Sequence, residues 1–274
     1  MTGAGTSPVS GPDADADADA RAALTRQVRA YWNARVHDLE MTDEPVGSPE
    51  FFAALDEYRF DKLAYLPRLV NFEGYAGARL LEIGCGIGTD LVRFACGGAR
   101  VCGVDLSDTA LRLARRNMEF NGHRPDTLLL ADGVALPFPD RSFDVVYAHG
   151  VLQYSADPRS IVTEAQRVLR PGGTAIFMVY NRNSWLMALS KIMKVGLEHE
   201  DAPGLRLYSA TEFRELLRGF TRMEIVPERF PVASRLHHGW KAAVYNGAFV
   251  GLFNAIPRAL VRRFGWHLMA LCVR

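Results

Sequence analysis

The chain of 274 residues has 49% hydrophobic and 23% charged residues and a formal net charge of +1, a composition typical of a globular protein with one sizeable core. Its longest apolar stretch, residues 242–256, is interrupted by two asparagines and is shorter than the roughly 20 apolar residues of a membrane-spanning helix, which argues against a membrane-spanning protein. The N-terminus shows no basic and apolar secretory signal, and the four cysteines have no CxxC or zinc spacing, so we expect a cytoplasmic protein with reduced thiols.

Charge is distributed unevenly along the chain. No acidic residue follows Glu228, and seven lysines and arginines give residues 229–274 a net charge of +7. Residues 1–228 have 25 basic and 31 acidic side chains, a net charge of −6. A basic end of this kind attracts either an anionic small molecule or an anionic membrane surface. Nucleic acid is not an expected partner, because no RNA- or DNA-binding module is recognisable.

The N-terminal part divides into a tail and a helical region. Residues 1–20 contain a run of alternating Asp and Ala and are predicted to be disordered, because they have almost nothing to bury. Residues 21–78 are predicted to form a helical segment before the core. One helix is expected over residues 21–39 and a second over residues 49–66, ended by Pro67.

The pattern changes at residue 79 to short apolar runs that alternate with helical segments. Such runs predict the buried parallel strands of a doubly wound α/β sheet. The expected strands are residues 80–83, 101–104, 127–131, 143–147 and 174–179. Two intervening helices have clear boundaries, one from Ser107 to Asn121 and another with Asp157 as N-cap and a Pro171-Gly172-Gly173 stop.

The C-terminal part continues the core and carries an insertion. We predict an irregular segment over residues 181–205, then a helix over 209–218 and a strand over 223–226, so that the core spans residues 79–228. Residues 229–264 are predicted to form a helical cap insertion. Residues 265–274 contain the last strand of the core, His267 to Val273.

A glycine-rich loop follows the first predicted strand. Gly84, Gly86 and Gly88 allow the backbone to approach a ligand closely, which implies a nucleotide-like ligand. In the dinucleotide-binding pattern G-x-G-x-x-G the third glycine would fall at Thr89, one residue later than it does here. Glu82, just before the first glycine, disfavours an anionic pyrophosphate and suits a cationic ligand.

This acidic and glycine-rich pattern, E-x-G-x-G-x-G, resembles motif I of the class I S-adenosylmethionine-dependent methyltransferases of the small-molecule type. The resemblance extends over about 100 residues, to the Leu-Arg-Pro-Gly-Gly turn at residues 169–173. It implies a mostly parallel, seven-stranded, Rossmann-like sheet with an N-terminal helical lid. It also implies S-adenosylmethionine as the cofactor, and transfer of its methyl group to a small-molecule acceptor.

The resemblance assigns roles to particular residues. Glu82 and the loop from Gly84 to Gly88, which includes Cys85, would line the methionine part of the cofactor. Asp105 and the adjacent Leu106 would bind the ribose. Asp132 and the adjacent Gly133 would bind the adenine.

The positions of the polar residues support this assignment independently of the family. Glu82, Asp105, Asp132 and His149 each lie at the carboxyl end of one of four successive predicted strands. That edge of an open α/β sheet is where ligands bind. The sequence therefore predicts one binding site formed by all four residues.

The predicted catalytic residues follow the fourth strand. The segment Ala148 to Tyr154 resembles the family's loop beside the transferable methyl group, which makes His149, Gln153 and Tyr154 the nearest candidates for contact with the acceptor. The sulfonium is already an activated leaving group, so holding the acceptor in line accounts for most of the catalysis. His149 is the candidate general base, needed only if the acceptor loses a proton; the alternative is that it packs against the cofactor or caps a backbone group.

Other residues allow two interpretations each. Tyr31 and Trp32 either belong to a lid over the cofactor or anchor their helix on the sheet. Tyr180 and Asn181 are expected to face the acceptor cavity. His199 lies among acidic neighbours, which is more typical of a solvated loop than of a metal site, and no metal is expected.

The cap insertion and the overall function each allow more than one interpretation. Residues 229–264 either cover the acceptor pocket or lie on a membrane surface as an amphipathic element. The leading hypothesis is a methyltransferase of a small, lipophilic metabolite, and the second is a methyltransferase of a membrane-associated lipid or quinone. A third is a nicotinamide-dependent oxidoreductase or a non-catalytic binding module on the same sheet, which Glu82 and the early third glycine disfavour.

Overall fold

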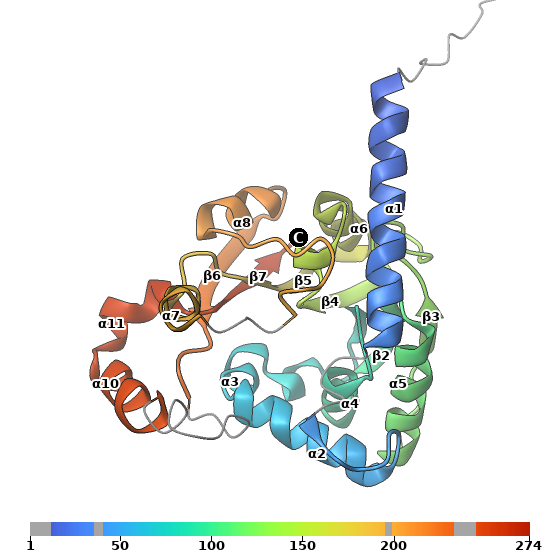
Figure 1. Ribbon diagram of the computed structural model, residues 1–274. Coiled ribbons are helices and arrows are strands. Elements are labelled where there is room, and N and C mark those ends of the chain that lie inside the picture. The colour runs from blue at the N-terminus through green and yellow to red at the C-terminus, as the bar shows by residue number, and fades with distance from the viewer. Residues whose placement is uncertain (1–11, 36–40, 195–198, 233–244) are drawn as a thin grey trace, which may run out of the picture.

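A seven-stranded sheet in the order β3-β2-β1-β4-β5-β7-β6 forms the centre of the molecule (Figure 1). The computed structural model describes residues 12–35, 41–194, 199–232 and 245–274. Neighbouring strands from β3 to β5 are parallel, and β7 is antiparallel to both β5 and β6. The strands are β1 (Arg79–Ile83), β2 (Arg100–Asp105), β3 (Thr127–Leu130), β4 (Phe143–His149), β5 (Leu169–Tyr180), β6 (Arg222–Glu228) and β7 (His267–Val273). The predicted doubly wound, mostly parallel α/β fold is confirmed.

Both faces of the sheet are covered, which explains why its strands are apolar runs. Along β4, Val145 and Tyr147 belong to one buried cluster while Val146 and Ala148 belong to the other. This alternation follows from the two-residue period of a strand. A strand that buries both faces must be apolar at every position.

Four helices flank the core: α4 (Thr89–Cys96), α5 (Asp108–Phe120), α6 (Pro158–Val168) and α8 (Ala210–Leu216). The three whose bounds were predicted, α5, α6 and α8, begin and end close to the predicted residues. The Ser107 and Asp157 side chains accept hydrogen bonds from the first turns of α5 and α6. The Ser209 hydroxyl and Glu212 carboxylate form a reciprocal capping box on α8. Side-chain caps of this kind satisfy backbone N–H groups that a helix leaves unpaired.

The first helix is longer than the sequence predicts. Helix α1 spans Pro12–Ala34, so the prediction that residues 12–20 are disordered is wrong; residues 1–11 and 36–40 lie outside the described residues. Proline suits the first turn of a helix, alanine has the highest helix propensity, and the helix dipole favours aspartates near the N-terminus. Arg21 also pairs with Asp17 one turn earlier, at 2.7 Å.

Three further boundaries differ from the prediction. Helix α2 (Pro49–Lys62) ends before α3 (Leu66–Val70), and Pro67 lies in the first turn of α3, where its missing N–H costs no bond. Helix α7 (Trp185–Met193), capped by Ser184, occupies part of the segment predicted to be irregular. Strand β5 begins directly after α6 and includes the Pro-Gly-Gly residues. Short 3₁₀ helices cover Phe72–Tyr75 and Leu152–Tyr154.

The cap insertion predicted over residues 229–264 is mostly helical from residue 245 onward, whereas residues 229–232 form no helix and residues 233–244 lie outside the described residues. Residues Tyr245–Phe249 form a π-helical turn that leads into α10 (Val250–Ala255), followed by α11 (Arg258–Val261) and a 3₁₀ turn over Arg262–Phe264. Helix α7 packs against this insertion, because the ring of Trp185 lies 5.9 Å from that of Phe249 and 6.0 Å from that of Phe253. These helices lie together at one side of the molecule, away from α1 (Figure 1).

Candidate active site

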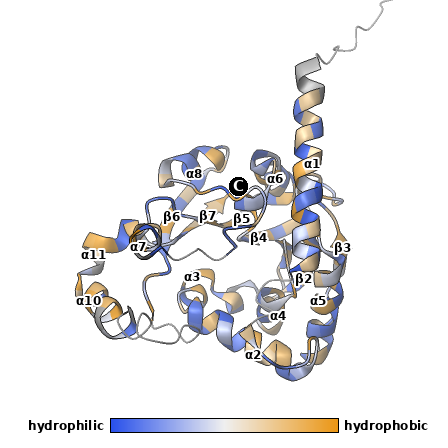
Figure 2. Cartoon of the chain, in the orientation of Figure 1, coloured by the Kyte–Doolittle hydropathy of each residue, from blue (hydrophilic) through white to orange (hydrophobic). Residues whose placement is uncertain are grey.

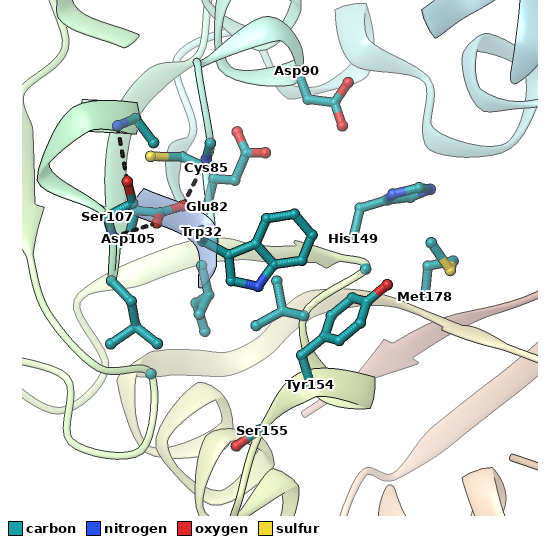
Figure 3. Close-up of a pocket in the computed structure, with 18 of the residues that line it drawn as sticks. Trp32, Glu82, Cys85, Asp90, Asp105, Ser107, His149, Tyr154, Ser155 and Met178 are labelled. Carbon is teal, nitrogen blue, oxygen red and sulfur yellow. Dashed lines mark hydrogen bonds between the residues drawn. The ribbon is translucent and has the colours of Figure 1, made fainter. Parts of the chain in front are cut away.

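A cavity of about 220 Å³ opens at the edge of the sheet where the parallel strands end. Glu82 at β1, Asp105 at β2, Asp132 after β3 and His149 at β4 all line it. Figure 3 shows the Asp105 and Glu82 side of the cavity, with His149 and Met178 on the opposite side. The structure therefore brings together the four residues that the sequence placed at one edge.

The glycine loop between β1 and α4 takes a conformation that favours glycine. Gly84, Gly86 and Gly88 have φ angles of 70°, 52° and 78°, in the left-handed region where a side chain is strained. A Cβ on Gly84 would lie 2.4 Å from Val151, whereas one on Gly86 would meet nothing within 4 Å. Gly86 thus leaves open space for a ligand. Gly88 does not line the cavity; a Cβ there would lie 3.2 Å from Ala114, so Gly88 permits α4 to pack against α5.

Asp105 is fixed by the backbone of the same loops. Its two carboxylate oxygens accept hydrogen bonds from Gly86 N–H and Ser107 N–H, each at 2.8 Å (Figure 3). Burial raises the pKa of Asp105, although these backbone N–H groups oppose the shift. Each oxygen retains a further lone pair, so the carboxylate can accept hydrogen bonds from two neighbouring ligand hydroxyls.

Glu82 is buried with one unsatisfied oxygen. The side chain is 4% exposed, and its Oε2 atom has no hydrogen-bond partner. Burial, together with the negative charge of Asp90, raises its pKa well above the ordinary value, and Arg59 opposes this shift. A buried polar atom without a partner is costly, so a cationic ligand group that donates a hydrogen bond to Glu82 would stabilise the site.

Asp132 lies in the turn after β3. Its Oδ1 atom accepts a hydrogen bond from Val134 N–H at 3.1 Å, which fixes the side chain. A Cβ on Gly133 would lie 2.9 Å from Ile83, so the backbone passes the end of β1 too closely for a larger residue. Leu106 and Gly133 both line the cavity, as does Cys85.

Arg59 and Asp90 form a buried pair that the sequence analysis missed. The Arg59 Nε atom donates to Asp90 Oδ1 at 2.7 Å, Arg59 Nη2 donates to Oδ2, and the Tyr147 hydroxyl donates to Oδ2 at 2.8 Å. Burial raises the pKa of Asp90, but the charge and hydrogen bonds of Arg59 outweigh it and hold that pKa below its usual value. Asp90 directly follows the glycine loop, which was a usable signal, whereas Arg59 lies 31 residues earlier.

His149 belongs to a buried chain of polar contacts. Its Nδ1 atom faces Arg59 Nη2 at 3.4 Å, and its Nε2 atom faces the Tyr65 hydroxyl at 3.3 Å. The same hydroxyl lies 2.6 Å from His267 Nδ1, and His267 Nε2 lies 3.0 Å from Arg229 Nη1. Burial, then Arg229, lowers the pKa of His267 well below its ordinary value. A neutral His267 must accept from Arg229, because arginine only donates, and it therefore donates to Tyr65.

Helix α1 contributes an aromatic wall. Trp32 lines the cavity, and its ring lies 5.3 Å from that of Tyr154 (Figure 3). The helix is held by the loop at residues 199–201, where Tyr31 donates to Asp201 at 2.9 Å and the His199 ring lies 5.1 Å from Trp32.

The remaining candidates separate into two groups. Tyr154 and Tyr180 line the cavity, whereas Gln153 and Asn181 do not. The expectation that Asn181 faces the acceptor cavity is therefore wrong: its amide donates to the backbone oxygens of Arg263 and Gly265 and ties β5 to the end of the insertion. No sequence pattern near Asn181 indicated that partner, because it lies more than 80 residues away.

Comparison with known proteins gives a consistent family. Residues 81–177 match the family model of a methyltransferase domain. The chain is 35% identical over 119 residues to a ubiquinone biosynthesis O-methyltransferase of Idiomarina loihiensis, covering 43% of this chain and 49% of that protein. It is 39% identical over 101 residues to the 27-O-demethylrifamycin SV methyltransferase of Amycolatopsis mediterranei, covering 36% and 37%. The chain thus spans about half the length, or less, of these curated relatives.

Solved structures share the fold. A possible histamine N-methyltransferase of Thermotoga maritima has a TM-score of 0.54 at 23% identity, covering 81% of this chain and 97% of that one. A protein of Pyrococcus horikoshii has a TM-score of 0.58 at 16% identity, covering 89% and 98%. The matched domain, the strand order and the acidic residues beside the glycine loop all indicate a methyltransferase. Residues 81–177 are therefore a methyltransferase domain, and the chain has the fold of S-adenosylmethionine-dependent methyltransferases of known structure.

Proposed function

We propose that this protein transfers the methyl group of S-adenosylmethionine to an oxygen atom of a small, lipophilic acceptor. The observation that carries the proposal is the cavity in which the unsatisfied, buried Glu82, the open space at Gly86 and the fixed Asp105 lie together. One relative is named as a ubiquinone biosynthesis O-methyltransferase and another as a methyltransferase of a 27-O-demethyl compound. These names support oxygen as the acceptor atom and a quinone-type molecule as the acceptor class.

The residues present fit the cofactor. We assign Glu82 and the loop from Gly84 to Gly86, including Cys85, to its cationic methionine part. Asp105, with Leu106 beside it, would accept hydrogen bonds from the ribose hydroxyls. Asp132 and Gly133 would hold the adenine. Gly88 has a structural role in this loop, because its lack of a side chain allows α4 and α5 to approach each other.

The chemistry asks the protein mainly for position. Bound S-adenosylmethionine supplies an activated methyl group: a C–O bond forms to the acceptor while the S–C bond breaks, and the electron pair stays on sulfur. The aromatic walls of Trp32 and Tyr154 exclude water and orient the acceptor, which lowers the entropic cost of the in-line approach. Tyr154 is thereby a positioning candidate beside the reacting atoms.

An acceptor hydroxyl must also lose its proton. We assign His149 as the base, because it lines the cavity at the carboxyl end of β4, next to the segment that leads to Tyr154. The ring nitrogens of His267 are held closely, at 2.6 and 3.0 Å, so that its lone pair is already used by Arg229.

Calorimetric titration and product analysis test the proposal. We expect saturable binding of S-adenosylhomocysteine, weakened by about 1–3 kcal/mol in Asp105→Ala because a hydrogen-bonding charged group is lost. The matched control is Asp126→Asn, because Asp126 forms an exposed ion pair with Arg100 at the start of β2, away from the cavity. Incubation with methyl-labelled cofactor and a metabolite extract should then yield a labelled methyl ether, identified by mass spectrometry. Tight binding of NADH with no binding of S-adenosylhomocysteine would overturn the proposal.

A membrane-associated acceptor is the second candidate, and a surface of α7, α10 and α11 favours it. Among the described residues, five of the eight large hydrophobic side chains that are exposed lie on or beside these helices: Ile192, Val232, Leu252, Ile256 and Leu260. Exposed Lys191, Lys194, Arg262 and Arg263 accompany them. Figure 2 shows apolar residues on α10 and α11. We propose that this apolar and basic surface contacts an anionic membrane. No described helix is long and apolar enough to cross a bilayer.

We assign this activity to the cytoplasm. All four cysteines are unpaired, and Cys85, Cys102 and Cys272 are buried. Free thiols are typical of proteins in a reducing compartment.

A further inference from the structure

The hydroxyl of Tyr65 lies behind the cavity wall and contacts two histidines that line it. It is 3.3 Å from His149 Nε2 and 2.6 Å from His267 Nδ1, whereas Tyr65 itself does not line the cavity. The two imidazole rings are 5.6 Å apart. The three residues come from separate elements, since Tyr65 precedes α3, His149 ends β4 and His267 begins β7. One buried hydroxyl therefore joins the proposed base to a second histidine.

The segment between α2 and α3 holds Tyr65 in this place. Tyr65 is 4% exposed, and Leu66 and Val70 of α3 are fully buried. All three belong to the same hydrophobic cluster as Met269 of β7. Because a buried side chain is closely surrounded by its neighbours, the Tyr65 hydroxyl is kept at the ends of the strands that carry both histidines.

The direction of the hydrogen bond between His267 and Tyr65 follows from Arg229. Arginine only donates, so His267 accepts from Arg229 at Nε2, and its Nδ1–H then donates to the Tyr65 oxygen. Burial keeps His267 in this neutral form, because it lowers the pKa of His267 well below the ordinary value. The hydrogen of the Tyr65 hydroxyl must therefore point away from His267. The other atoms within reach are His149 Nε2 and Met269 Sδ, the latter at 3.8 Å.

This arrangement serves both protonation states of His149. A neutral His149 accepts from the Tyr65 hydroxyl at Nε2 or donates to its oxygen, according to which ring nitrogen carries hydrogen. A protonated His149 can only donate, and the Tyr65 oxygen has a second lone pair for it while the hydroxyl hydrogen turns to Met269. Hydrogen bonds from a charged donor are the stronger ones, so Tyr65 favours the protonated ring that general-base catalysis produces.

Other charged and titratable side chains act on the same groups from several elements. They include Arg59 and Lys62 of α2, Asp90 of α4, Tyr147 of β4, Glu228 at the end of β6 and Arg229 after it. All of them remain when a single oxygen atom is removed from Tyr65. A change of pH dependence in Tyr65→Phe therefore reports on the hydroxyl.

We propose that Tyr65 is a positioning residue of the methyl transfer, which orients the His149 ring and stabilises its protonated form, and that His267 holds Tyr65 in place. This inference rests on the proposed function and adds the group that supports its base. In the transfer the acceptor O–H proton passes to His149, the acceptor oxygen bonds to the methyl carbon, and the electron pair of the broken S–C bond stays on sulfur. Tyr65 keeps its own proton throughout.

The pH dependence of methyl-ether formation tests the inference. The rate is measured between about pH 5 and pH 9 with saturating methyl-labelled S-adenosylmethionine and a metabolite extract, for the unmodified protein and for Tyr65→Phe. Because the protonated ring loses its partner, the midpoint of the rise in rate with pH should move to lower pH by about half to one unit. The rate on the plateau should fall by about 10–100-fold. The affinity for S-adenosylhomocysteine, measured calorimetrically, should stay the same.

Tyr75→Phe is the matched control. The Tyr75 ring packs on the same hydrophobic cluster, 5.9 Å from the ring of Phe94, and it does not line the cavity. This variant loses a tyrosine hydroxyl without touching either histidine, so the midpoint and the plateau of the rate should both stay unchanged.

Two variants of His267 test the same role from the other side of Tyr65. His267→Leu removes the N–H group that fixes the Tyr65 oxygen, whereas His267→Asn keeps an N–H group near the position of Nδ1. The plateau rate should therefore fall further in His267→Leu than in His267→Asn. This pair of variants decides the question if Tyr65→Phe does not fold.

The outcomes separate this inference from the proposed function. An unchanged or raised midpoint in Tyr65→Phe, even with a lower plateau, would overturn the positioning role, and so would equal rates in the two His267 variants. Absence of any labelled methyl ether with the unmodified protein would instead overturn the proposed methyl transfer, and an unchanged rate in His149→Gln would overturn its base.

Discussion

At the scale of single residues, Glu82 combines burial, an unsatisfied oxygen and a raised pKa. In the ligand-free protein its pKa lies well above the ordinary value of 4.5, first because of burial and then because of Asp90. An acid with a raised folded-state pKa makes the folded protein bind more protons than the unfolded chain. The free energy of unfolding of the ligand-free protein therefore falls as the pH rises from the ordinary value through the raised one.

We predict that binding of S-adenosylmethionine releases protons. The cationic ligand favours ionised Glu82 and lowers its pKa, so the affinity should rise with pH through the raised pKa, and up to about one proton should be released below it. Calorimetric titrations in buffers of different ionisation enthalpy measure the released protons.

Glu82→Gln provides the control for this prediction, since it keeps the shape of the side chain and cannot ionise. Most of the proton release and the corresponding loss of stability with rising pH should disappear in this variant. Binding heats of the unmodified protein that are identical in all buffers would contradict the prediction.

The proposed base gives a second prediction at this scale. Replacing His149 with Gln should lower kcat by roughly 10²–10⁴-fold if it removes the acceptor proton, with little change in the affinity for S-adenosylhomocysteine. The loss should shrink for an acceptor that is already deprotonated at the assay pH. His123→Gln, a histidine outside the cavity beside Cys96, is the matched control. An unchanged kcat in His149→Gln would end its role as a base.

At the scale of elements, α1 forms part of the cavity through one side chain. Trp32 lies between the cavity and His199, and α1 is fastened at Tyr31 and Arg35 by Asp201. The helix is thus anchored through Tyr31 and Arg35, and Trp32 lines the cavity; that the helix forms a lid over the cofactor stays a prediction.

Removing the Trp32 ring tests the contribution of α1. Trp32→Ala should weaken the binding of S-adenosylhomocysteine by about 0.5–1.5 kcal/mol, the size of one aromatic contact between the ring and the ligand, whereas Trp32→Phe should retain most of the affinity. Titration of both variants, with thermal unfolding as a check on folding, measures the difference. Equal affinity of Trp32→Ala and the unmodified protein would show that α1 serves only as an anchor.

At the scale of the whole molecule, the acidic and basic parts of the chain contribute charged side chains to different places. The acidic part includes Glu82, Asp105 and Asp132, which line the cavity at the ends of β1, β2 and β3. The basic part contributes Arg229 to the cavity beside His267, and it contributes Arg262 and Arg263 to the exposed surface beside α11. The net charge of +1 conceals both.

We predict that the apolar and basic surface binds anionic vesicles. The double variant Leu252→Asp, Leu260→Asp should abolish co-sedimentation with phosphatidylserine-containing liposomes, because both leucines are largely exposed, at 74% and 67%, and carboxylates repel the anionic lipid. Val46→Asp, exposed at 58% outside this surface, should co-sediment like the unmodified protein.

Salt and activity separate this surface from the cavity. High salt should weaken the co-sedimentation of the unmodified protein, and the double variant should retain its affinity for S-adenosylhomocysteine. Two outcomes would contradict membrane contact: the unmodified protein stays in the supernatant at low salt, or the double variant co-sediments as well as the unmodified protein does.

The sequence alone determined the local features of this protein. Apolar runs and capping residues such as Ser107 and Asp157 fixed the strands and most helices, because period and caps are encoded within a few neighbouring residues. Glu82, Asp105 and Asp132 were predictable for the same reason, since each lies within two residues of the end of a strand. The Asp-Ala run was misjudged because its composition suggested disorder while its helix propensity was high.

Only the tertiary structure decided the other half of the site. His267 lines the cavity because β7 inserts between β5 and β6, and Arg59 reaches Asp90 because α2 packs against α4. These neighbours are distant in the chain, and their proximity depends on which faces bury each other. A one-dimensional pattern specifies what a residue can contact, whereas the packing of the whole chain selects the partner.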